Sequence, residues 1–347
     1  MKKVVFCAVA LMSGAMLFAQ GNISDVDQTG NGNISDVDQT GLMNDSYVLE
    51  LGDNNESDVD QVGTTNDAET YQQGDGNFSA IDQDGTDNVA KTWQGYYFGT
   101  DGNDNTSYVE QDGAENESYV YQLPNSDGNY STVAQSGFSN YSFVQQFGDT
   151  NNSHVDQAGD DNQSIVYEIG NNNHSGVMQD GNDNDSWVWQ AGAAYISSSP
   201  GDDNTSEVTQ LGDRNISTVD QIGNGNDSYV IQGPQEDNIS DVNQTGDGNT
   251  SFVDQWGDRN NSFVNQEGNN NGSTVYQGQI DDDNISVVNQ LGDDNTSYVM
   301  QDGFWNNSDV LQDGMMNTSS VEQFGNNHMS TVTQLGNSNG SNVTQSN

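Results

Sequence analysis

Residues 22–41 read Asn-Ile-Ser-Asp-Val-Asp-Gln-Thr-Gly-Asn-Gly-Asn-Ile-Ser-Asp-Val-Asp-Gln-Thr-Gly, and this stretch decides the fold. It holds one 11-residue unit, Asn-x-Ser-x-Val-x-Gln-x-Gly-x-x, and most of a second. The unit recurs in 28 copies, which begin at residues 22, 33, 44, 55, 66, 77, 88, 105, 116, 129, 140, 151, 162, 173, 184, 204, 215, 226, 238, 249, 260, 271, 284, 295, 306, 317, 328 and 339. Such a repeat indicates a stacked architecture in which each unit buries its inner face against its neighbours.

Within a unit the constant residues fall on alternate positions, which is the periodicity of a β-strand. Asn, Ser, Val and Gln therefore share one face, while the intervening positions vary among acidic, aromatic and β-branched residues. The same spacing on a helix would scatter the constant residues around the axis. The glycine that follows, with Asn, Asp or Gly after it, supplies the positive-φ conformations that reverse the chain.

Two strands and two turns close one coil of 22 residues, which predicts an all-β solenoid of 14 coils with two strands per coil. At about 4.8 Å per coil the stack is roughly 67 Å long. Each strand is expected to lie parallel and in register with the strand two copies later. Asn and Gln side chains can then bond along ladders, so that the buried polar groups are satisfied.

The inner-face residues near both ends of the repeat array are the candidate self-assembly ladder, and the glycines beside them are the candidate turn residues. The ladder residues are Asn22, Ser24, Val26, Gln28, Asn33, Ser35, Val37, Gln39, Asn317, Ser319, Val321, Gln323, Asn339, Ser341, Val343 and Gln345. The turn glycines are Gly30, Gly41, Gly325 and Gly336. Inner-face exceptions are few, and the only two at the glutamine position are Glu50 and Glu168.

Longer spacings between copies mark insertions. The larger ones, around Tyr96–Gly102 and Ala193–Asp203, and a smaller one at Asn125–Gly128 follow odd-numbered copies. Short ones near Pro234 and Gln279 follow even-numbered copies. The larger loops are therefore expected to bulge from one edge of the solenoid, where turns tolerate extra residues.

The first nineteen residues differ from the repeats. Lys2 and Lys3 precede the apolar stretch from Val4 to Phe18, and small residues stand at Ala15 and Ala19. This pattern predicts a secretory signal peptide over residues 1–19, with the repeat solenoid over residues 20–347. About fifteen interrupted apolar residues are too few for a comfortable membrane span.

The composition excludes several classes of protein. Only 31% of the residues are hydrophobic and the net charge is −48, values typical of disorder were it not for the repeat. Without the signal peptide the chain loses Cys7, its one cysteine, and keeps 53 acidic residues against Lys91, Arg214 and Arg259. Disulfides, nucleic-acid binding and membrane insertion are therefore not expected.

The spacing resembles the curlin repeat of bacterial curli fibres, Ser-x5-Gln-x-Gly-x2-Asn-x-Ala-x3-Gln. The residues that match it in the first two copies are Asn22, Gln28, Gly30, Asn33, Ser35 and Gln39. The resemblance covers about 325 residues, with Asn in place of the first Ser and mostly Ser in place of Ala. It implies a secreted amyloid fibre subunit at the bacterial cell surface, used in the biofilm matrix and in surface adhesion.

The resemblance also implies partners. These are further copies of the chain in a homopolymeric fibre, a nucleating minor subunit, and an outer-membrane pore that exports the chain unfolded. The abundance of Asp and Gly resembles the major subunit rather than the nucleator. Two features depart from the family: the repeats are many more, and no pore-targeting segment separates Ala19 from the first copy.

No atypical capping repeat stands at either end of the array, and uncapped solenoid edges with the same inner-face pattern are templates for stacking. A head-to-tail contact of this kind does not close and generates a filament. The rival interpretation is a monomeric secreted adhesin or ligand-binding solenoid. An ice-binding solenoid would need a regular outward Thr array, and a calcium-binding solenoid would need a Gly-Gly-x-Gly-x-Asp pattern that the chain lacks.

The outward positions raise two further questions. Asp36 and Asp38 should stack on Asp58 and Asp60, which is unfavourable. We interpret the acids as keeping the exported chain soluble, with acid pH or divalent cations favouring assembly as the alternative. Aromatic residues at the middle outward position of nine copies are expected to pack as cross-strand ladders. Nothing in the pattern nominates catalytic, cofactor or metal residues, so no enzyme and no cofactor are expected.

Overall fold

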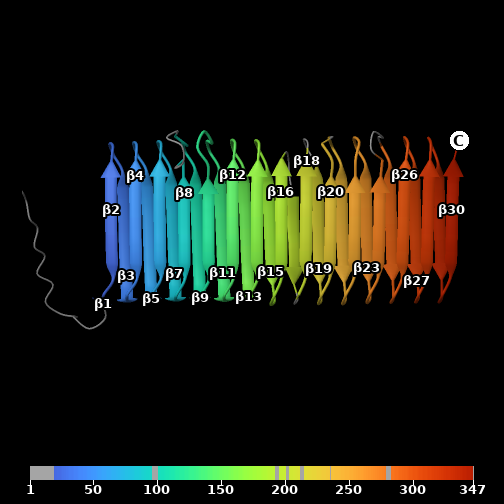
Figure 1. The fold of residues 1–347 in the computed structure, drawn as a ribbon, viewed down its shortest axis with the longest axis horizontal. Coiled ribbons are helices and arrows are strands. Elements are labelled where there is room, and N and C mark those ends of the chain that lie inside the picture. The colour runs from blue at the N-terminus through green and yellow to red at the C-terminus, as the bar shows by residue number, and fades with distance from the viewer. Residues whose placement is uncertain are drawn as a thin grey trace, which may run out of the picture.

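Two long parallel β-sheets lie face to face and form the whole of the described structure (Figure 1). The computed structural model describes residues 19–95, 101–191, 195–200, 203–211, 215–234, 236–278 and 283–346. Each sheet has 15 strands, and the chain alternates between the sheets along most of its length. Strands and turns, with no helix, make up the described residues. The predicted all-β solenoid of about 14 coils of 22 residues is confirmed.

We call the sheets odd and even after their strand numbers. The odd sheet contains β1 (Ala19–Gln20), β3 (Ile34–Leu42), β5 (Glu56–Thr64), β7 (Phe78–Thr86), β9 (Thr106–Ala114), β11 (Tyr130–Phe138), β13 (Asn152–Asp160), β15 (His174–Asp180), β17 (Tyr195–Pro200), β19 (Ile216–Ile222), β21 (Ile239–Thr245), β23 (Asn261–Glu267), β25 (Ile285–Leu291), β27 (Asn307–Asp313) and β29 (Met329–Leu335).

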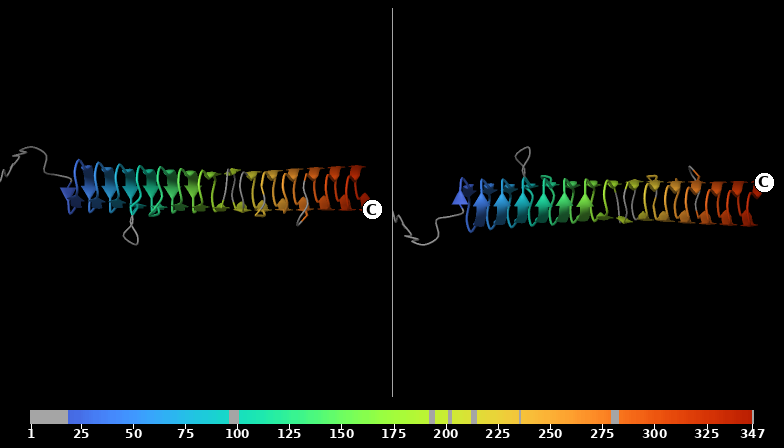
Figure 2. Two further views of the ribbon diagram at one scale, coloured as in Figure 1. Left: turned by 90° about the horizontal axis from the view of Figure 1, so that it is seen from above. Right: turned by 90° about the horizontal axis from the view of Figure 1, so that it is seen from below.

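The even sheet contains β2 (Ile23–Thr29), β4 (Asp45–Leu51), β6 (Asp67–Gln73), β8 (Val89–Gln94), β10 (Glu117–Gln122), β12 (Tyr141–Phe147), β14 (Gln163–Ile169), β16 (Asp185–Ala191), β18 (Thr205–Leu211), β20 (Asp227–Gln232), β22 (Thr250–Gln255), β24 (Gly272–Gln277), β26 (Thr296–Asp302), β28 (Thr318–Phe324) and β30 (Gly340–Ser346). Viewed from above and below, the coils follow one another along a single long axis (Figure 2).

Neighbouring strands of a sheet are parallel and in register, as the repeat predicted. In β11 and β13, for example, Val133 lies opposite Val155 and Gln135 opposite Gln157. Asp36 and Asp38 of β3 lie opposite Asp58 and Asp60 of β5, so the expected stacking of like charges is confirmed.

The core is one thin layer between the two sheets. Its apolar part is a row of buried residues, almost all valines, with buried Asn, Ser and Gln on either side. Two threonines at the valine position show how the sheets face each other. Thr70 Oγ1 lies 3.4 Å from Ser79 Oγ of the facing strand, and Thr92 Oγ1 lies 3.4 Å from Ser107 Oγ. The valine row of one sheet therefore lies across from the serine row of the other.

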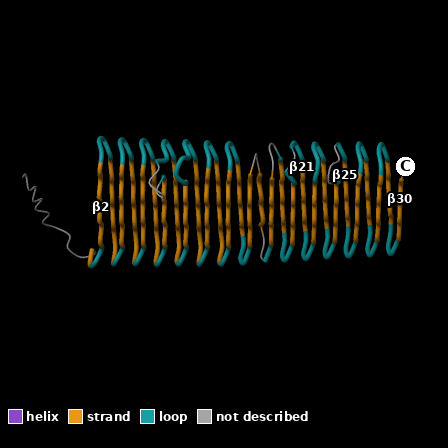
Figure 3. Tube along the Cα trace, turned by 45° about the horizontal axis from the view of Figure 1, so that its top comes forward, coloured by secondary structure: helices purple, strands orange, loops and turns teal. Residues whose placement is uncertain are grey.

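The turns form a row along each edge of the stack (Figure 3). The repeat glycines that the structure describes have a positive φ, for example +120° at Gly41 and +119° at Gly63, as expected. A second positive-φ position comes just before the Asn of the next copy and holds residues such as Thr65 (φ 58°) and Trp305 (φ 58°). The sequence did not predict this second position, because β-branched and large residues rarely adopt a left-handed conformation.

The segment Ala193–Asp203 is not a loop, and here the prediction was wrong. Its residues 195–200 form β17, which pairs with β15 and β19 and fills a strand position in the odd sheet. Ser197 stands in register with Val177 and Val219. Backbone hydrogen bonds in a sheet need no particular side chain, so a segment without the repeat residues can occupy a strand position.

The extra strand changes which sheet every later copy joins. The copies that begin at residues 184 and 204 both lie in the even sheet, as β16 and β18. All four remaining insertions therefore follow even-sheet strands, namely β8, β10, β20 and β24. All four therefore leave from one edge of the solenoid, including the short ones near Pro234 and Gln279.

The insertion after β8 begins and ends at residues whose main chain is hydrogen-bonded to the neighbouring coils. Gly95 N donates to Gln122 O at 2.9 Å and Gly102 N donates to Gln73 O at 3.1 Å. Residues 96–100 between them lie outside the described residues, as does almost all of the predicted signal peptide.

The turn glycines can be tested by substitution. In Gly63→Ala the new Cβ would lie 1.9 Å from the carbonyl oxygen of Gly85, at a φ of +119°. We expect a loss of at least about 2 kcal/mol of unfolding free energy, measured by urea denaturation followed by circular dichroism.

Gly225→Ala is the matched control, because its φ is +61° and no atom lies within 4 Å of the new Cβ. It should lose only about 1 kcal/mol. Equal losses in the two variants would contradict the role assigned to the close approach of successive coils.

Candidate self-assembly surface

The glutamine rows are chains of hydrogen bonds with a direction, interrupted in the even sheet after Glu50 and after Glu168. Gln61 Nε2 donates to Gln83 Oε1 at 2.8 Å, and Gln83 Nε2 donates to Gln111 Oε1 at 2.8 Å. The second hydrogen of the same amide reaches the facing strand, as from Gln61 Nε2 to Asp45 O at 2.9 Å. A glutamine between two other glutamines of a row therefore accepts from the preceding coil and donates to the next. The predicted glutamine ladder is present.

The asparagine rows bond mostly to the main chain. Asn55 N donates to Asn33 Oδ1 at 3.0 Å, and Asn55 Nδ2 donates to Gly74 O at 2.8 Å. Side-chain to side-chain bonds occur in part of the row, for example from Asn140 Nδ2 to Asn116 Oδ1 at 3.0 Å. The asparagine begins the strand beside the turn, and its short side chain there reaches the turn carbonyl of the next coil. The predicted ladder thus takes a mixed form.

The serine rows depart from the expectation that buried polar groups are satisfied. Buried hydroxyls such as those of Ser142, Ser153 and Ser164 have no hydrogen-bond partner among the described residues. Neighbours in a row are about 4.8 Å apart, which is too far for one hydroxyl to reach the next. The facing row is valine, which offers no partner. Ser319 and Ser297, at 3.2 Å, are an exception.

The two end strands of the even sheet, β2 and β30, expose the inner face that strands such as β4 bury, whereas the inner face of β29, at the end of the odd sheet, stays buried. Val26 of β2 is 42% exposed, whereas Val48 of β4 is completely buried. On β30 the inner-face side chains of Ser341, Val343 and Gln345 are only partly covered. Within the described residues β30 pairs with β28 and β2 pairs with β4, each on one side.

The candidate ladder residues fall where the repeat placed them. The Ser, Val and Gln residues of the four sets lie on β2, β3, β28 and β30. The Asn of each set comes directly before its strand. Asn317, Val321 and Gln323 of the penultimate even-sheet coil are fully buried. The candidate turn glycines have positive φ, and a Cβ on Gly30 would lie 1.7 Å from Gly52 O.

The outer face of the odd sheet carries a row of acids. Asp38, Asp60, Asp82 and Glu110 follow one another in register through β3, β5, β7 and β9. Partial burial raises the pKa of Asp60 and of Asp82, and the neighbouring carboxylates raise each pKa further. The neighbouring carboxylates of this row therefore repel one another when they are ionised, as the sequence predicted.

Many turn acids have a structural role that the sequence analysis did not identify. Asp53 Oδ1 accepts from Asn31 N at 2.7 Å, and Asp75 Oδ1 accepts from Asp53 N at 2.8 Å. Asn103 Oδ1 continues the row by accepting from Asp75 N at 2.9 Å. Asp and Asn share this position because both offer an Oδ1 acceptor to the turn of the preceding coil.

The outer face of the even sheet carries a row of aromatic rings. The expected ladder of middle outward positions is corrected, because in this row only Tyr47 and Phe143 hold that position and the other five rings stand two residues later in their copies. Successive ring centroids are 5.0–5.5 Å apart in the order Tyr47, Tyr71, Trp93, Tyr121, Phe143, Tyr167 and Trp189. A shorter row joins Phe252, Tyr276 and Tyr298 at 5.5 and 5.9 Å. Most of the stacked rings lie on this sheet, although Phe78, Tyr108 and Tyr130 form a shorter row on the odd sheet. This distribution was hidden in the sequence, because the sheet to which each later copy belongs depends on β17.

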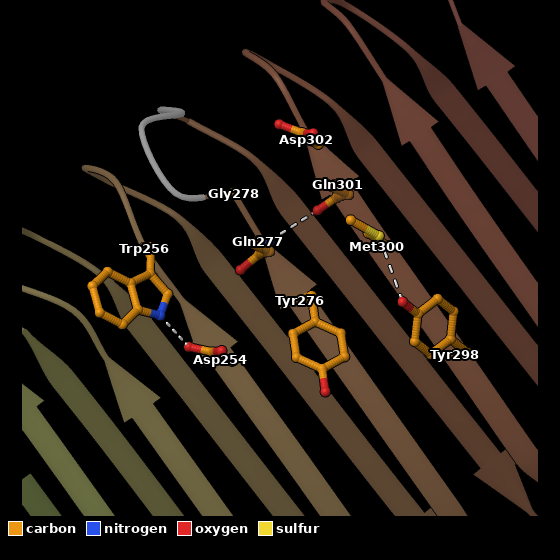
Figure 4. Close-up of a pocket in the computed structure, with 9 residues that line it drawn as sticks. All are labelled: Asp254, Trp256, Tyr276, Gln277, Gly278, Tyr298, Met300, Gln301 and Asp302. Atoms are coloured by element: carbon orange, nitrogen blue, oxygen red, sulfur yellow. Dashed lines mark hydrogen bonds between the residues drawn. The ribbon is translucent and has the colours of Figure 1, made fainter.

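A depression of about 650 Å³ lies on this aromatic face across β22, β24 and β26 (Figure 4). Trp256, Tyr276 and Tyr298 line it from successive strands, with Asp254 and Met300 between them. Trp256 Nε1 donates to Asp254 Oδ1 at 2.5 Å, so this carboxylate already has a partner. The arrangement is an open surface of mixed character, with three aromatic side chains and no convergent catalytic groups.

Two searches of the described residues found no site of another kind. No group of three or more His, Cys, Asp or Glu side chains there is arranged to hold a metal ion. No helix in that part of the chain has the length and apolar character of a membrane span.

Comparison with known protein families supports the resemblance seen in the repeat. A family model described as the curlin associated repeat matches residues 63–91, 127–159, 201–233 and 292–325. Each match covers consecutive strands and turns of the solenoid, so the resemblance inferred from the spacing is confirmed. No curated protein matches the sequence.

A glutamine in the row can be tested against an outward neighbour on the same strand. Gln290 accepts from Gln266 Nε2 at 2.8 Å and donates to Gln312 Oε1 at 2.9 Å. Gln290→Leu leaves Gln266 without its acceptor and Gln312 without its donor. We therefore expect a loss of roughly 1–3 kcal/mol of unfolding free energy in urea denaturation. Asn289→Leu, on the outer face beside Leu311, should change it by less than about 0.5 kcal/mol. The ladder account fails if both variants behave alike.

The acid row predicts a pH dependence with a definite sign. The pKa of Asp60 and of Asp82 is raised in the folded state, so their repulsion disappears as pH falls through the folded pKa toward 3.8. The double variant Asp60→Asn/Asp82→Asn should therefore raise the urea midpoint at pH 7. At pH 3 its midpoint should equal that of the wild type. An equal gain at both pH values would exclude charge repulsion as the cause.

Proposed function

We propose that this chain, which belongs to the curlin repeat family, is the structural subunit of an extracellular curli-like amyloid fibre. In this role it acts through its shape and its contacts and is not an enzyme. Proteins of this family are extracellular curli components, so the proposed site of action is the bacterial cell surface. The proposed uses are the biofilm matrix and adhesion.

One observation carries the proposal: the inner face that internal even-sheet strands such as β4 bury is accessible at β2 and β30, the two end strands of the even sheet. Each internal strand covers its neighbour with the same four residue types in the same register. A strand from a second copy would give β30 the pairing that β28 already gives it. The glutamine row would also continue, because Gln323 Nε2 donates to Gln345 Oε1 at 2.8 Å and Gln345 has the same donor to offer onward.

The same contact would repeat without closing, since each added copy presents a new end strand with the inner-face pattern. Parallel, in-register strands stacked along one axis are the arrangement of cross-β fibres. The acids oppose association while the chain is in transit, and the rows of amides favour it once two ends meet.

The partners proposed are further copies of the chain, a nucleating minor subunit, and an outer-membrane pore for export in the unfolded state. The first rests on the accessible end strands, and the other two rest on the family. A monomeric adhesive solenoid is the second candidate, and the exposed rings of the even sheet favour it, with Trp187 45% and Trp189 40% exposed.

Fibre growth from the chain without its first nineteen residues tests the proposal. We expect fibres whose X-ray diffraction has a meridional reflection near about 4.8 Å. Val343→Lys/Gln345→Lys places two charges on the accessible inner face of β30 and should slow elongation from preformed seeds by at least about tenfold, since a buried unpaired charge costs several kcal/mol.

Asn342→Lys/Thr344→Lys is the matched control, because these two residues lie on the outer face of the same strand. It should elongate like the wild type. A chain that stays monomeric under all conditions would favour the adhesive solenoid. Equal slowing by both pairs would show that end stacking through the inner face is wrong.

A further inference from the structure

Two carboxyl groups stand inside the glutamine row of the even sheet. Glu50 on β4 and Glu168 on β14 occupy the position that glutamine holds in the neighbouring strands, and both are completely buried. An ionised carboxylate can accept hydrogen bonds but cannot donate one, whereas a glutamine amide does both. The row therefore needs a hydrogen at these two places that an ionised glutamate lacks.

The hydrogen bonds around Glu50 stop at this point. Gln28 Nε2 donates to Glu50 Oε2 at 2.6 Å, in the usual direction of the row. The other oxygen, Glu50 Oε1, has no partner, and neither does Oε1 of Gln72, the next residue in the row. Beyond it the row resumes, with Gln72 Nε2 donating to Gln94 Oε1 at 2.9 Å.

The same interruption occurs at Glu168. Gln146 Nε2 donates to Glu168 Oε2 at 2.8 Å, and then Glu168 Oε1 and Gln190 Oε1 are both left without a partner. Gln190 lies in register with Glu168, and Gln190 Nε2 donates onward to Gln210 Oε1 at 3.2 Å. At both places two consecutive members of the row thus present acceptor oxygens and no hydrogen between them.

We infer that Glu50 and Glu168 are proton-binding sites of the solenoid, at which the neutral carboxyl group donates its hydrogen to Oε1 of the next glutamine and joins the two parts of the row. One proton at each site satisfies two buried oxygens at once. The inference concerns a single folded chain and holds whether or not the chain forms fibres.

The surroundings of both sites favour the neutral form. The inner-face residues of the strands on either side and of the facing odd-sheet strands are uncharged Asn, Ser, Ala, Val, Thr and Gln. Burial raises the pKa of Glu50 to about 7, opposed by the hydrogen bond from Gln28 and assisted by the charge of Glu56 on β5. Burial likewise raises the pKa of Glu168 to about 7, opposed by the hydrogen bond from Gln146.

The sign of the pH effect follows from these values. Each pKa is about 7 in the folded chain against an ordinary value of 4.5, so between these pH values the folded chain holds a proton that the unfolded chain has lost. The stabilisation is fully present below about pH 4.5 and is lost as pH rises through about 7. Within this window each site changes the folding equilibrium constant by up to about tenfold per pH unit.

The double variant Glu50→Gln/Glu168→Gln tests the inference, because an amide supplies the missing hydrogen at every pH. We expect urea denaturation of the variant to lose most of the pH dependence that the wild type shows between pH 5 and pH 7. Each single variant should lose the part of this pH dependence that corresponds to the binding of about one proton. The variant should also be the more stable chain at pH 7.5.

Asp60→Asn/Asp82→Asn is the control, since these acids lie on the outer face of the odd sheet and their removal should leave the contribution of the two buried sites intact. Infrared spectra of the wild type at pH 6 should contain the carbonyl band of a protonated carboxylic acid, and the Glu50→Gln/Glu168→Gln variant should lack this part of it. Identical pH dependence in the wild type and that double variant, or a band unchanged by the substitutions, would overturn the inference.

Discussion

The hydrogen bond from each buried amide to the one in the next coil is the contact on which the solenoid depends. Its geometry demands the same residue type at the same place in every coil, because a donor must meet an acceptor at each step. Asn and Gln therefore recur with few exceptions, while Ser and Val recur as the small residues between the facing sheets. A chain with only 31% hydrophobic residues can still fold in this way, since the apolar core is almost entirely valine. Rows of Asn, Ser and Gln make up the remainder of the buried layer.

The same constraint separates the two kinds of acid in this chain. Acids in the turns accept main-chain hydrogens from the preceding coil and so belong to the stacking pattern. Acids such as Asp60 on the outer face of the odd sheet stack on their own kind and oppose it. Net charge alone does not distinguish these roles, and interpreting all acids as solubilising would overlook the structural ones.

Most of the fold could be predicted from the sequence, because period two, the turn glycines and the 11-residue spacing each point to one arrangement. The inner and outer faces, the register and the glutamine rows followed directly. The misplaced segment was Ala193–Asp203, whose β17 has none of the inner-face residues that identify a strand. The unpartnered oxygens beside Glu50 could not be predicted either, since the direction of the amide row is a property of the stacked structure.

β17 also determines which sheet each later copy joins. With two strands per coil, adding or removing one strand moves every later copy from one side of the ribbon to the other. The rings of Tyr47 to Trp189 and those of Phe252 to Tyr298 share a side because one irregular strand lies between the two groups in the chain. Without it, the rings of Phe252 to Tyr298 would lie on the odd sheet. A segment that lacks the repeat's Asn-x-Ser-x-Val-x-Gln pattern is thus what keeps both groups of rings on one side of the ribbon.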